Sequence, residues 1–426
     1  MKIDKIFITL FITLNLSAEP LRTIIQEVIS KNEEIHSLIQ ASKATQKEVE
    51  IVYAQYLPKL KLSTEVGREH TATFGNQGKN KYLTTKYASL EGSLNLFSGF
   101  ETTYKIKEKK LLFELSKFTL KDKMISIAYS ISLIHLDILK AYNILQVIRK
   151  NTKIHKETLD KVILRLENGV GYESDMYQAQ SRLDFSKISE IMANKNLKNL
   201  TIQYRRLTGK SLNLSKMKYP KIDEKILDKE DLYAQVKIAN PKIQIAKLKV
   251  KISKVIHKQT KSKYYPLVDL VATKNWSTNI HGLEEDDNSE KLLLRMSYNL
   301  YNGYSDKNKD LKMQYESISK EHQKQMKLKD FKEKLSLAYS NFIFFNKQLK
   351  LMKLQLNNIH KTHTLYKKEY EYDKRSVLEL LNVEQEYNQT YINKVQVKIN
   401  RLKAYFEILE ISGYLLKYFQ IGEKIL

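Results

Sequence analysis

The sequence predicts a mainly α protein with a small β part, built as two copies of one plan. Only 5 Pro and 12 Gly occur among 426 residues, which is few for a loop-rich or all-β chain. Apolar residues follow helical spacing over two stretches of about 70 residues, 100–168 and 304–372. At about 1.5 Å per residue each stretch corresponds to roughly 100 Å of helix, so we expect a coiled-coil-like array.

The second copy repeats landmarks of the first at a nearly constant spacing. The motif LNLFSGF returns as YNLYNGY, and NEEIHSLIQ returns as NPKIQIAKL. Gly99 precedes Gly303 by 204 positions, and Gly209 precedes Gly413 by the same number. This agreement indicates an internal duplication. We expect a first repeat at 19–215, a linker at 216–230 and a second repeat at 231–426.

Each repeat reads as a helix, a β-hairpin, a long helix and a shorter helix. In the first repeat the opening helix runs from Glu19 to Leu57, where Pro58 ends it. The other expected elements are hairpins at 59–97 and 266–302, long helices at 100–168 and 304–372, and shorter helices at 173–208 and 376–419.

The N-terminus has the layout of a cleavable export signal. Lys2 and Lys5 precede an apolar run, and two small residues end at Ala18. The run is too short to span a bilayer, so we expect residues 1–18 to be a secretory signal peptide. No later stretch reaches 18 consecutive apolar residues, so an exported chain that enters a membrane would do so by strands.

The expected strands have two distinct faces. In the fourth strand Leu292, Leu294 and Met296 alternate with Leu293 and Arg295. This alternation fits a lipid-facing barrel and also a soluble sheet with one buried face. The export signal favours the barrel. Because about eight strands are the practical minimum for closure, a chain with four strands would have to share its barrel with other copies.

Composition excludes several classes of function. The chain has no Cys, which excludes disulfides, Cys-based metal sites and a lipid-modified N-terminal Cys. Its formal charge is +25, but the Lys residues are spread along every segment and interleaved with Glu. No dense basic block with interleaved aromatic residues occurs, so we expect a solvated helix surface and no nucleic-acid partner.

Two matched turns reverse the long helices. The first reads RLENGVGYESDMYQAQSRLD at 165–184, and the second reads YEYDKRSVLELLNVEQEY at 370–387. With the 204-residue offset, Asp175 aligns with Glu379, and Gln178 aligns with Asn382. Ser376 is a plausible N-cap for the helix that follows the second turn. The sequence therefore predicts two helix tips with matching acidic positions.

The export signal, the duplicated plan, the LNLFSG and YNLYNG junctions and the two turns together resemble the TolC family of outer-membrane channel proteins. The resemblance covers essentially the whole chain after the signal peptide. It implies a homotrimer in the outer membrane, in which three protomers share a twelve-stranded β-barrel. It also implies an α-helical tunnel in the periplasm that is closed at its tip.

The resemblance also assigns roles to residues at the tip. Members of the family close the entrance with bonds between the two turns, and the matching residues here are Tyr370 and Arg375 on the second turn and Asp175 on the first. The plainer alternatives are a helix N-terminal charge for Asp175 and an ordinary surface ion pair for Arg375 with Glu379.

The same family narrows its pore with acidic rings just after the second turn. The matching positions are Glu379 and Asn382. Glu379 keeps the negative charge, and three such carboxylates would attract cations. Asn382 departs from the family pattern because an amide carries no charge, so a second ring is not expected here.

No signature of catalysis or of a cofactor site occurs in the sequence, which contains no nucleophile elbow, phosphate loop or HExxH motif. His360 and His363 have the i, i+3 spacing of a two-ligand metal site, but no third ligand completes the motif. We expect these histidines to lie on a solvated surface. The chain is therefore predicted to be neither an enzyme nor a metal or cofactor carrier.

The resemblance implies a passive exit duct for an inner-membrane transporter, either an ABC exporter or a proton-driven pump, with a periplasmic adaptor and the outer-membrane lipid as further partners. The two turns look closer to members that serve type I protein secretion, and efflux of drugs or metals is the alternative. A secreted coiled-coil structural or adhesion protein is an alternative of another class. A basic nucleic-acid-binding coiled coil is disfavoured by the export signal.

Overall fold

The computed structural model describes residues 19–70, 82–214, 217–222, 228–280, 284–372 and 374–421. The expected signal peptide, 1–18, lies outside these residues. The chain divides into two compact units, of which the first comprises Met1–His36, Leu120–Ile243 and Leu328–Leu426, and the second Ser37–Thr119 and Gln244–Lys327. The long helices α3 (Glu101–Glu167) and α7 (Ser305–Glu371) contribute to both units.

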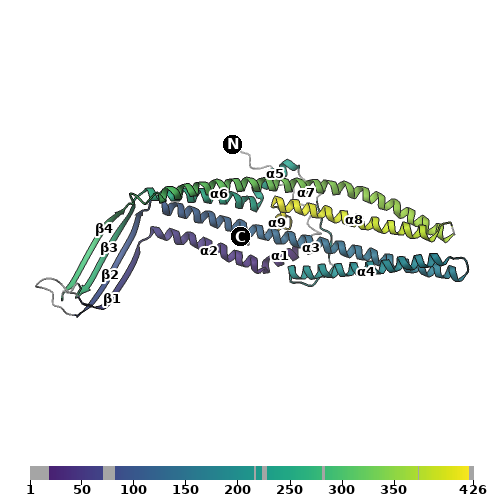
Figure 1. Ribbon diagram of the computed structural model, residues 1–426, viewed down its shortest axis with the longest axis horizontal. Helices are drawn as coiled ribbons and strands as arrows, with labels where there is room; N and C mark the ends of the chain where they lie inside the picture. Colours follow the sequence, from purple (N-terminus) through teal and green to yellow (C-terminus); the bar gives the residue numbers. More distant parts are fainter. Residues whose placement is uncertain are drawn as a thin grey trace. The chain divides into compact units, whose positions relative to one another are not determined.

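The second unit contains a four-stranded antiparallel sheet with the order β1-β2-β3-β4 (Figure 1). The strands are β1 (Lys59–His70), β2 (Tyr82–Phe97), β3 (Leu267–Thr278) and β4 (Asp286–Ser297). Each repeat supplies one hairpin, and the pairing of β2 with β3 joins the two repeats. The expected hairpins at 59–97 and 266–302 contain these strands, although β4 already ends at Ser297.

The apolar face of this sheet is exposed, and its polar face is hydrogen-bonded. Leu60 is 75% exposed and Leu294 is 70% exposed. On the other face the Asn275 side-chain oxygen accepts hydrogen bonds from Tyr87 and Ser89, at 3.1 and 2.8 Å. A sheet of a soluble domain has the opposite arrangement, because it buries its apolar face.

A left-handed turn connects β2 to α3. Gly99 and Phe100 have φ angles of 61° and 67°. A Cβ atom on Gly99 would lie 2.5 Å from the carbonyl oxygen of Ser262, so glycine is required there. Gly303 and Tyr304 have φ angles of 66° and 64° in the second repeat. The repeated junction motif therefore specifies the same backbone turn twice.

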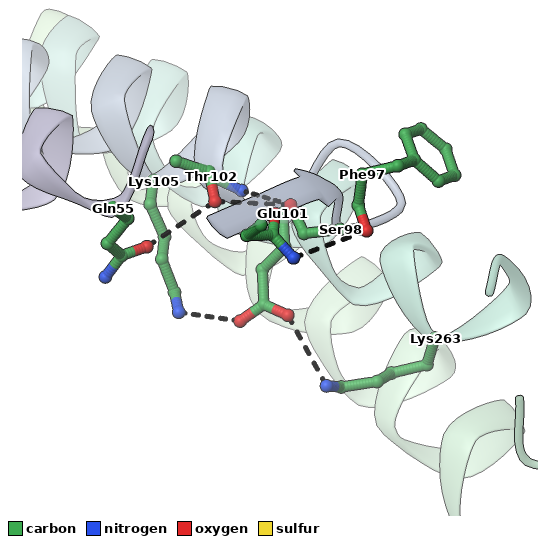
Figure 2. A network of polar contacts seen from close by, with 8 residues as sticks. Gln55, Phe97, Ser98, Glu101, Thr102, Lys105 and Lys263 are labelled. Carbon is green, nitrogen blue, oxygen red and sulfur yellow. Dashed lines mark hydrogen bonds and ion pairs between the residues drawn. The ribbon is translucent and has the colours of Figure 1, made fainter. Parts of the chain in front are cut away.

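Side chains from three segments fix the first junction (Figure 2). The Glu101 carboxylate pairs with Lys105 at 2.6 Å and with Lys263 at 3.4 Å. The hydroxyl of Thr102 donates to the side-chain oxygen of Gln55 at 3.5 Å. The short segments η1 (Ala54–Tyr56) and η3 (Lys261–Tyr264) supply Gln55 and Lys263 to this network.

The single helix expected at 19–57 is wrong, because the chain breaks it at Asn32. The segment forms α1 (Glu19–Lys31) and α2 (Glu33–Tyr53). The Asn32 side chain accepts a hydrogen bond from the amide of Ile35 at 3.0 Å and so starts α2. Asn240 does the same for Ile243 at 3.1 Å, between α5 (Lys229–Ala239) and α6 (Pro241–Thr260).

The long and short helices have equal lengths in the two repeats. Helices α3 and α7 each contain 67 residues, and α4 (Glu173–Thr208) and α8 (Val377–Ser412) each contain 36. Gly209 and Gly413 end the shorter helices with φ angles of 68° and 76°. The helix expected at 376–419 therefore stops at Ser412, and α9 (Leu415–Tyr418) is a separate turn.

The first unit buries its large apolar side chains between helices. Phe342, Phe406 and Phe419 are fully buried, and Ile134, Ile138 and Tyr204 form a further cluster. Helix α3 contains an 18-residue window with a mean hydropathy of 1.4, which is apolar enough to cross a membrane, but 61% of this window is buried in the protein. Packing against other helices explains that apolar composition.

Candidate functional site: the two helix turns

The first turn, between α3 and α4, is formed by the backbone. Gly169 has a φ angle of 76°, and its amide donates to the carbonyl of Leu166 at 3.0 Å. A Cβ atom on Gly171 would lie 2.8 Å from the backbone nitrogen of Leu166. Tyr172 occupies the N-cap position of α4 without a side-chain cap. Two glycines, rather than capping side chains, therefore make this reversal.

The second turn, between α7 and α8, is closed by side chains. Ser376 caps α8 by accepting a hydrogen bond from the amide of Glu379 at 3.2 Å. The Glu379 carboxylate accepts in return from the amide of Ser376 at 3.0 Å, which completes a capping box. Before the cap, the amide of Lys374 donates to the carbonyl of Glu369 at 2.9 Å. Asp373 lies outside the described residues.

Arg375 is held by the same turn. Its guanidinium pairs with Glu369 at 2.8 Å and with Glu379 at 2.7 Å, and lies 4.2 Å from the ring centre of Tyr366. Hydrogen bonds from the Ser376 amide and from Arg375 lower the pKa of Glu379 to about 2. The two glutamates, Glu369 first, raise the pKa of Arg375 above its usual value. The ionised form of each group is therefore favoured.

The residues assigned to a gate latch are not bonded to one another within the chain. Tyr370 is 7% exposed, and the guanidinium of Arg165 lies 5.3 Å from its ring centre. Asp175 lies in the first turn of α4, and among the described residues it has no ion-pair partner. Arg375 instead uses two glutamates near its own turn. A bond between Arg375 and Asp175 stays a prediction that one chain does not test.

The two residues assigned to the pore constriction both have partners. The Glu379 carboxylate is engaged by Ser376 and Arg375, although 44% of its side chain is exposed. The Asn382 side-chain oxygen accepts from Arg182 of α4 at 3.2 Å, and Arg182 also donates to Gln385. Asn382 therefore joins α8 to α4, a contact that the sequence did not predict.

A buried polar cluster that the sequence did not predict lies next to Tyr370. Glu384 of α8 is 3% exposed and pairs with His363 of α7, whose side chain is 15% exposed. His155 of α3 is 4% exposed, and its Nδ1 atom has no hydrogen-bond partner among the described residues. Asn388 donates to Glu384 at 3.2 Å. The expectation of a solvated His363 is therefore wrong.

One signal in the sequence could have indicated this cluster. Glu384 follows Leu380 by four positions and Leu381 by three, so it falls on the apolar face of its own helix. A carboxylate on such a face needs a partner, because burying an unpaired charge is costly. The partners come from α3 and α7, which are distant in sequence, so no spacing rule names them.

Burial and charge set the protonation of this cluster. Burial lowers the pKa of His155, and the attraction of Glu384 only partly opposes this, while Arg182 lowers the pKa further. Burial alone would raise the pKa of Glu384, but hydrogen bonds from His363 and Asn388 lower it on balance. Within the described chain, no group of three His, Asp or Glu side chains is arranged to hold a metal ion.

The comparisons with known proteins agree on the fold. The model of the family described as outer membrane efflux protein matches residues 24–210. Among curated proteins, none matches the sequence significantly. The crystal structure of CusC, described with transmembrane channel formation, covers 95% of this chain and 95% of its own, with a TM-score of 0.80 at 12% identity.

Two further structures are similar over nearly the whole chain. The CmeC outer membrane channel of Campylobacter jejuni has a TM-score of 0.80 at 13% identity and covers 93% of this chain and 86% of its own. The outer membrane protein VceC of Vibrio cholerae has a TM-score of 0.80 at 11% identity and covers 93% of this chain and 96% of its own.

These relatives are described as outer-membrane proteins and channels rather than as enzymes. The structural matches, at 11–13% identity, establish the fold alone. The family model matches residues of the first repeat. Both agree with the resemblance that the junctions and turns indicate. Residues 24–210 thus match the outer membrane efflux protein family, and the chain as a whole has the fold of TolC-type outer-membrane channels.

Proposed function

We propose that the chain is one subunit of an outer-membrane channel that serves as a passive exit duct. The main support for this proposal is the distribution of apolar and polar side chains on the four-stranded sheet. Its apolar face, with Leu60, Leu62, Leu292 and Leu294, is exposed, while its polar face is hydrogen-bonded. In a membrane barrel the apolar face contacts lipid and the polar face lines the lumen.

The edges of the sheet support assembly with other copies. Strands β1 and β4 are the outer strands, so each keeps one edge without a partner among the described strands. An unpaired edge is not viable in lipid, and four strands do not close a barrel. Two copies would already supply eight strands, about the minimum for closure, so the strand count alone does not set the number of copies. On the resemblance to the TolC family we infer a homotrimer with twelve strands, whose helices form the periplasmic tunnel.

The energy for transport would come from partners. The sequence contains no phosphate loop, and no metal-binding group occurs in the described part of the chain. We propose that a periplasmic adaptor and an inner-membrane transporter dock at the helix turns and open the tunnel there. The transporter, either an ABC exporter or a proton-driven pump, would supply the driving force.

Two kinds of cargo remain candidates, each with its own support. The family description names efflux, which favours small molecules or metal ions. The sequences of the two turns favour type I protein secretion instead. Deleting the gene separates the candidates, because loss of efflux sensitises cells to drugs or metals, whereas loss of secretion removes one protein from the medium.

We also propose that Asp175, Tyr370 and Arg375 act together at the closed entrance. The Arg375–Asp175 bond would form with a neighbouring copy, or would replace one of the two glutamate contacts of Arg375. Glu379 would then line the constriction with the part of its side chain that is exposed. Asn382 would hold α8 against α4 rather than provide a charged ring.

Single-channel recording of the purified protein in a planar bilayer tests the central proposal. We expect a particle with about three times the mass of one chain and a small, cation-selective conductance. A monomer without conductance that does not fractionate with outer membranes would contradict the proposal. That outcome would favour a secreted coiled-coil structural protein instead.

A further inference from the structure

The buried cluster beside the second turn joins the two helical hairpins α3–α4 and α7–α8. A cavity of about 60 Å³ lies between His155 of α3, His363 of α7 and Glu384 of α8. Two polar bonds cross between the same hairpins, from Asn388 to Asn151 at 2.6 Å and from Arg182 to Asn382 at 3.2 Å. The cavity is large enough to admit water, so protons have access to the cluster.

Charged groups from the surrounding helices face this cavity. Glu157 and Lys161 on α3, and Lys367 and Glu371 on α7, place two charges of each sign at its rim. Lys161 and Glu371 pair with each other at 3.8 Å. None of these four groups is among the charges that act on the pKa of His155 or of Glu384.

The other groups near His155 do not stabilise a positive charge on its ring. Tyr387 of α8 stacks on His363 with ring centres 5.4 Å apart, and burial raises the pKa of Tyr387, so it stays neutral. His360 contacts the same tyrosine ring at 5.3 Å. Arg182 of α4 adds a positive charge that acts on His155. Glu384 is the negative group that acts on His155, and it is already paired with His363.

We propose that this cluster is a proton-sensitive lock between the two helical hairpins, in which neutral His155 favours the closed entrance and protonated His155 favours the open one. The inference rests on the proposed function as a gated channel. A positive charge on His155 would lie buried and would be repelled by the positive charge of Arg182, and separation of the hairpins would bring it into water.

The direction of the pH effect follows from proton binding. In the packed arrangement of this structure burial lowers the pKa of His155 below its usual value of 6.5, so a closed state with this packing binds fewer protons than an open state with hydrated His155. The closed state therefore loses relative stability as pH falls below about 6.5. Glu384, whose pKa is lowered from 4.5, acts in the same direction at lower pH.

The test compares wild-type protein with three variants by single-channel recording at about pH 7.5 and about pH 5.5. His155→Gln removes the titrating ring and keeps a neutral polar side chain. Glu384→Gln removes the buried charge. His322→Gln, at an exposed position of α7, is the matched control.

We expect the open fraction of the wild-type and His322→Gln channels to rise on acidification. The rise between the two pH values should be at most about tenfold, because a single proton that binds the open state at a pKa of about 6.5 shifts the equilibrium by no more than tenfold for each pH unit below that value. The His155→Gln channel should not respond, and the Glu384→Gln channel should already be more open at the higher pH. A wild-type channel without a pH response, or a His155→Gln channel with the full response, would overturn the proposal.

Melting temperatures of the same proteins provide a readout that does not need conductance. On acidification the wild type should lose stability relative to His155→Gln, because the unfolded chain binds a proton that the folded chain resists. Equal losses in both proteins would reject the proton-sensitive cluster. If no variant conducts but the melting temperatures diverge, the channel function fails while the proton-sensitive contact stands.

Discussion

The two reversals of the chain occupy matched positions in the repeats, but different groups form them. In the first turn Gly169 adopts a left-handed conformation, and Gly171 packs against the backbone of Leu166. In the second turn Ser376 and Glu379 cap each other, and Arg375 bridges two glutamates. The first turn thus depends on the absence of side chains, whereas the second depends on their charges and hydrogen bonds.

Because of this difference, the two turns offer different groups for a bond between them. Asp175 at the first turn has no ion-pair partner in the described chain, so its carboxylate is available to an incoming group. Arg375 at the second turn already pairs with Glu369 through Nε and with Glu379 through Nη1. A bond between the turns would therefore either use the remaining N–H groups of the guanidinium or exchange one glutamate partner for Asp175, with a small net change in free energy.

Substitution of Gly171 should have the largest effect. In Gly171→Ala the new methyl group meets the backbone at 2.8 Å, and such overpacking costs about 1–3 kcal/mol. Hydrogen exchange of peptides from the first turn should accelerate, while peptides from the second turn should not change. Equal acceleration at both turns would mean that they unfold as one unit.

Gly169→Ala should destabilise the first turn less. The position has a φ angle of 76° and open space for a methyl group, so only backbone strain of about 1–2 kcal/mol is expected. Gly169→Asn should recover part of the loss, since Asn tolerates the left-handed conformation. Thermal unfolding would check the order wild type, Asn, Ala, and an unstable Asn variant with a normal Ala variant would contradict it.

Ser376→Ala should weaken only the second turn. Loss of the N-cap costs about 1 kcal/mol, and Ser376→Asp should restore the cap. The readout is hydrogen exchange of peptides at the start of α8. Tyr172→Ala at the uncapped start of α4 is the matched control, and an equal effect there would show that side-chain capping does not distinguish the turns.

Lowering the pH should destabilise the second turn only in strongly acidic solution. The pKa of Glu379 is lowered from 4.5 to about 2, so its contribution to folding is complete above about pH 4.5 and is lost as pH falls through about 2. The difference between wild type and Glu379→Gln in α8 hydrogen exchange should be constant from neutral pH to about 4.5 and then shrink. If this difference already begins to shrink near pH 6, the titrating groups would be those of the buried histidine cluster rather than Glu379.

The smallest effect is expected for the ion pairs themselves, because exposed pairs contribute little to stability. Arg375→Ala and Asp175→Ala should each raise the conductance modestly without changing the melting temperature. Glu369→Gln should lower the conductance, because the Nε group of Arg375 loses its ion-pair partner and becomes available to Asp175. Unchanged conductance in all three variants would reject the proposed gate bond.

Local chemistry made much of the fold predictable. The helical periodicity, the alternating strands and the recurring glycines each act within a few residues, so the sequence shows them directly. The 204-residue spacing then predicted the equal lengths of α3 and α7, whereas the second shorter helix was expected to reach residue 419 and α8 ends at Ser412. The break at Asn32 was missed because a single side-chain cap interrupts an otherwise continuous apolar pattern.

The candidate site was only partly predictable. The sequence determined where the chain reverses, that Ser376 caps a helix, and which residues stand at the turns. Only the tertiary structure decided that Arg375 pairs with Glu369 and Glu379, and that Glu384 meets His363 beside His155. It also decided that the apolar face of the sheet is exposed. Such partnerships depend on how helices and strands far apart in the sequence pack together, and periodicity within one element does not contain that information.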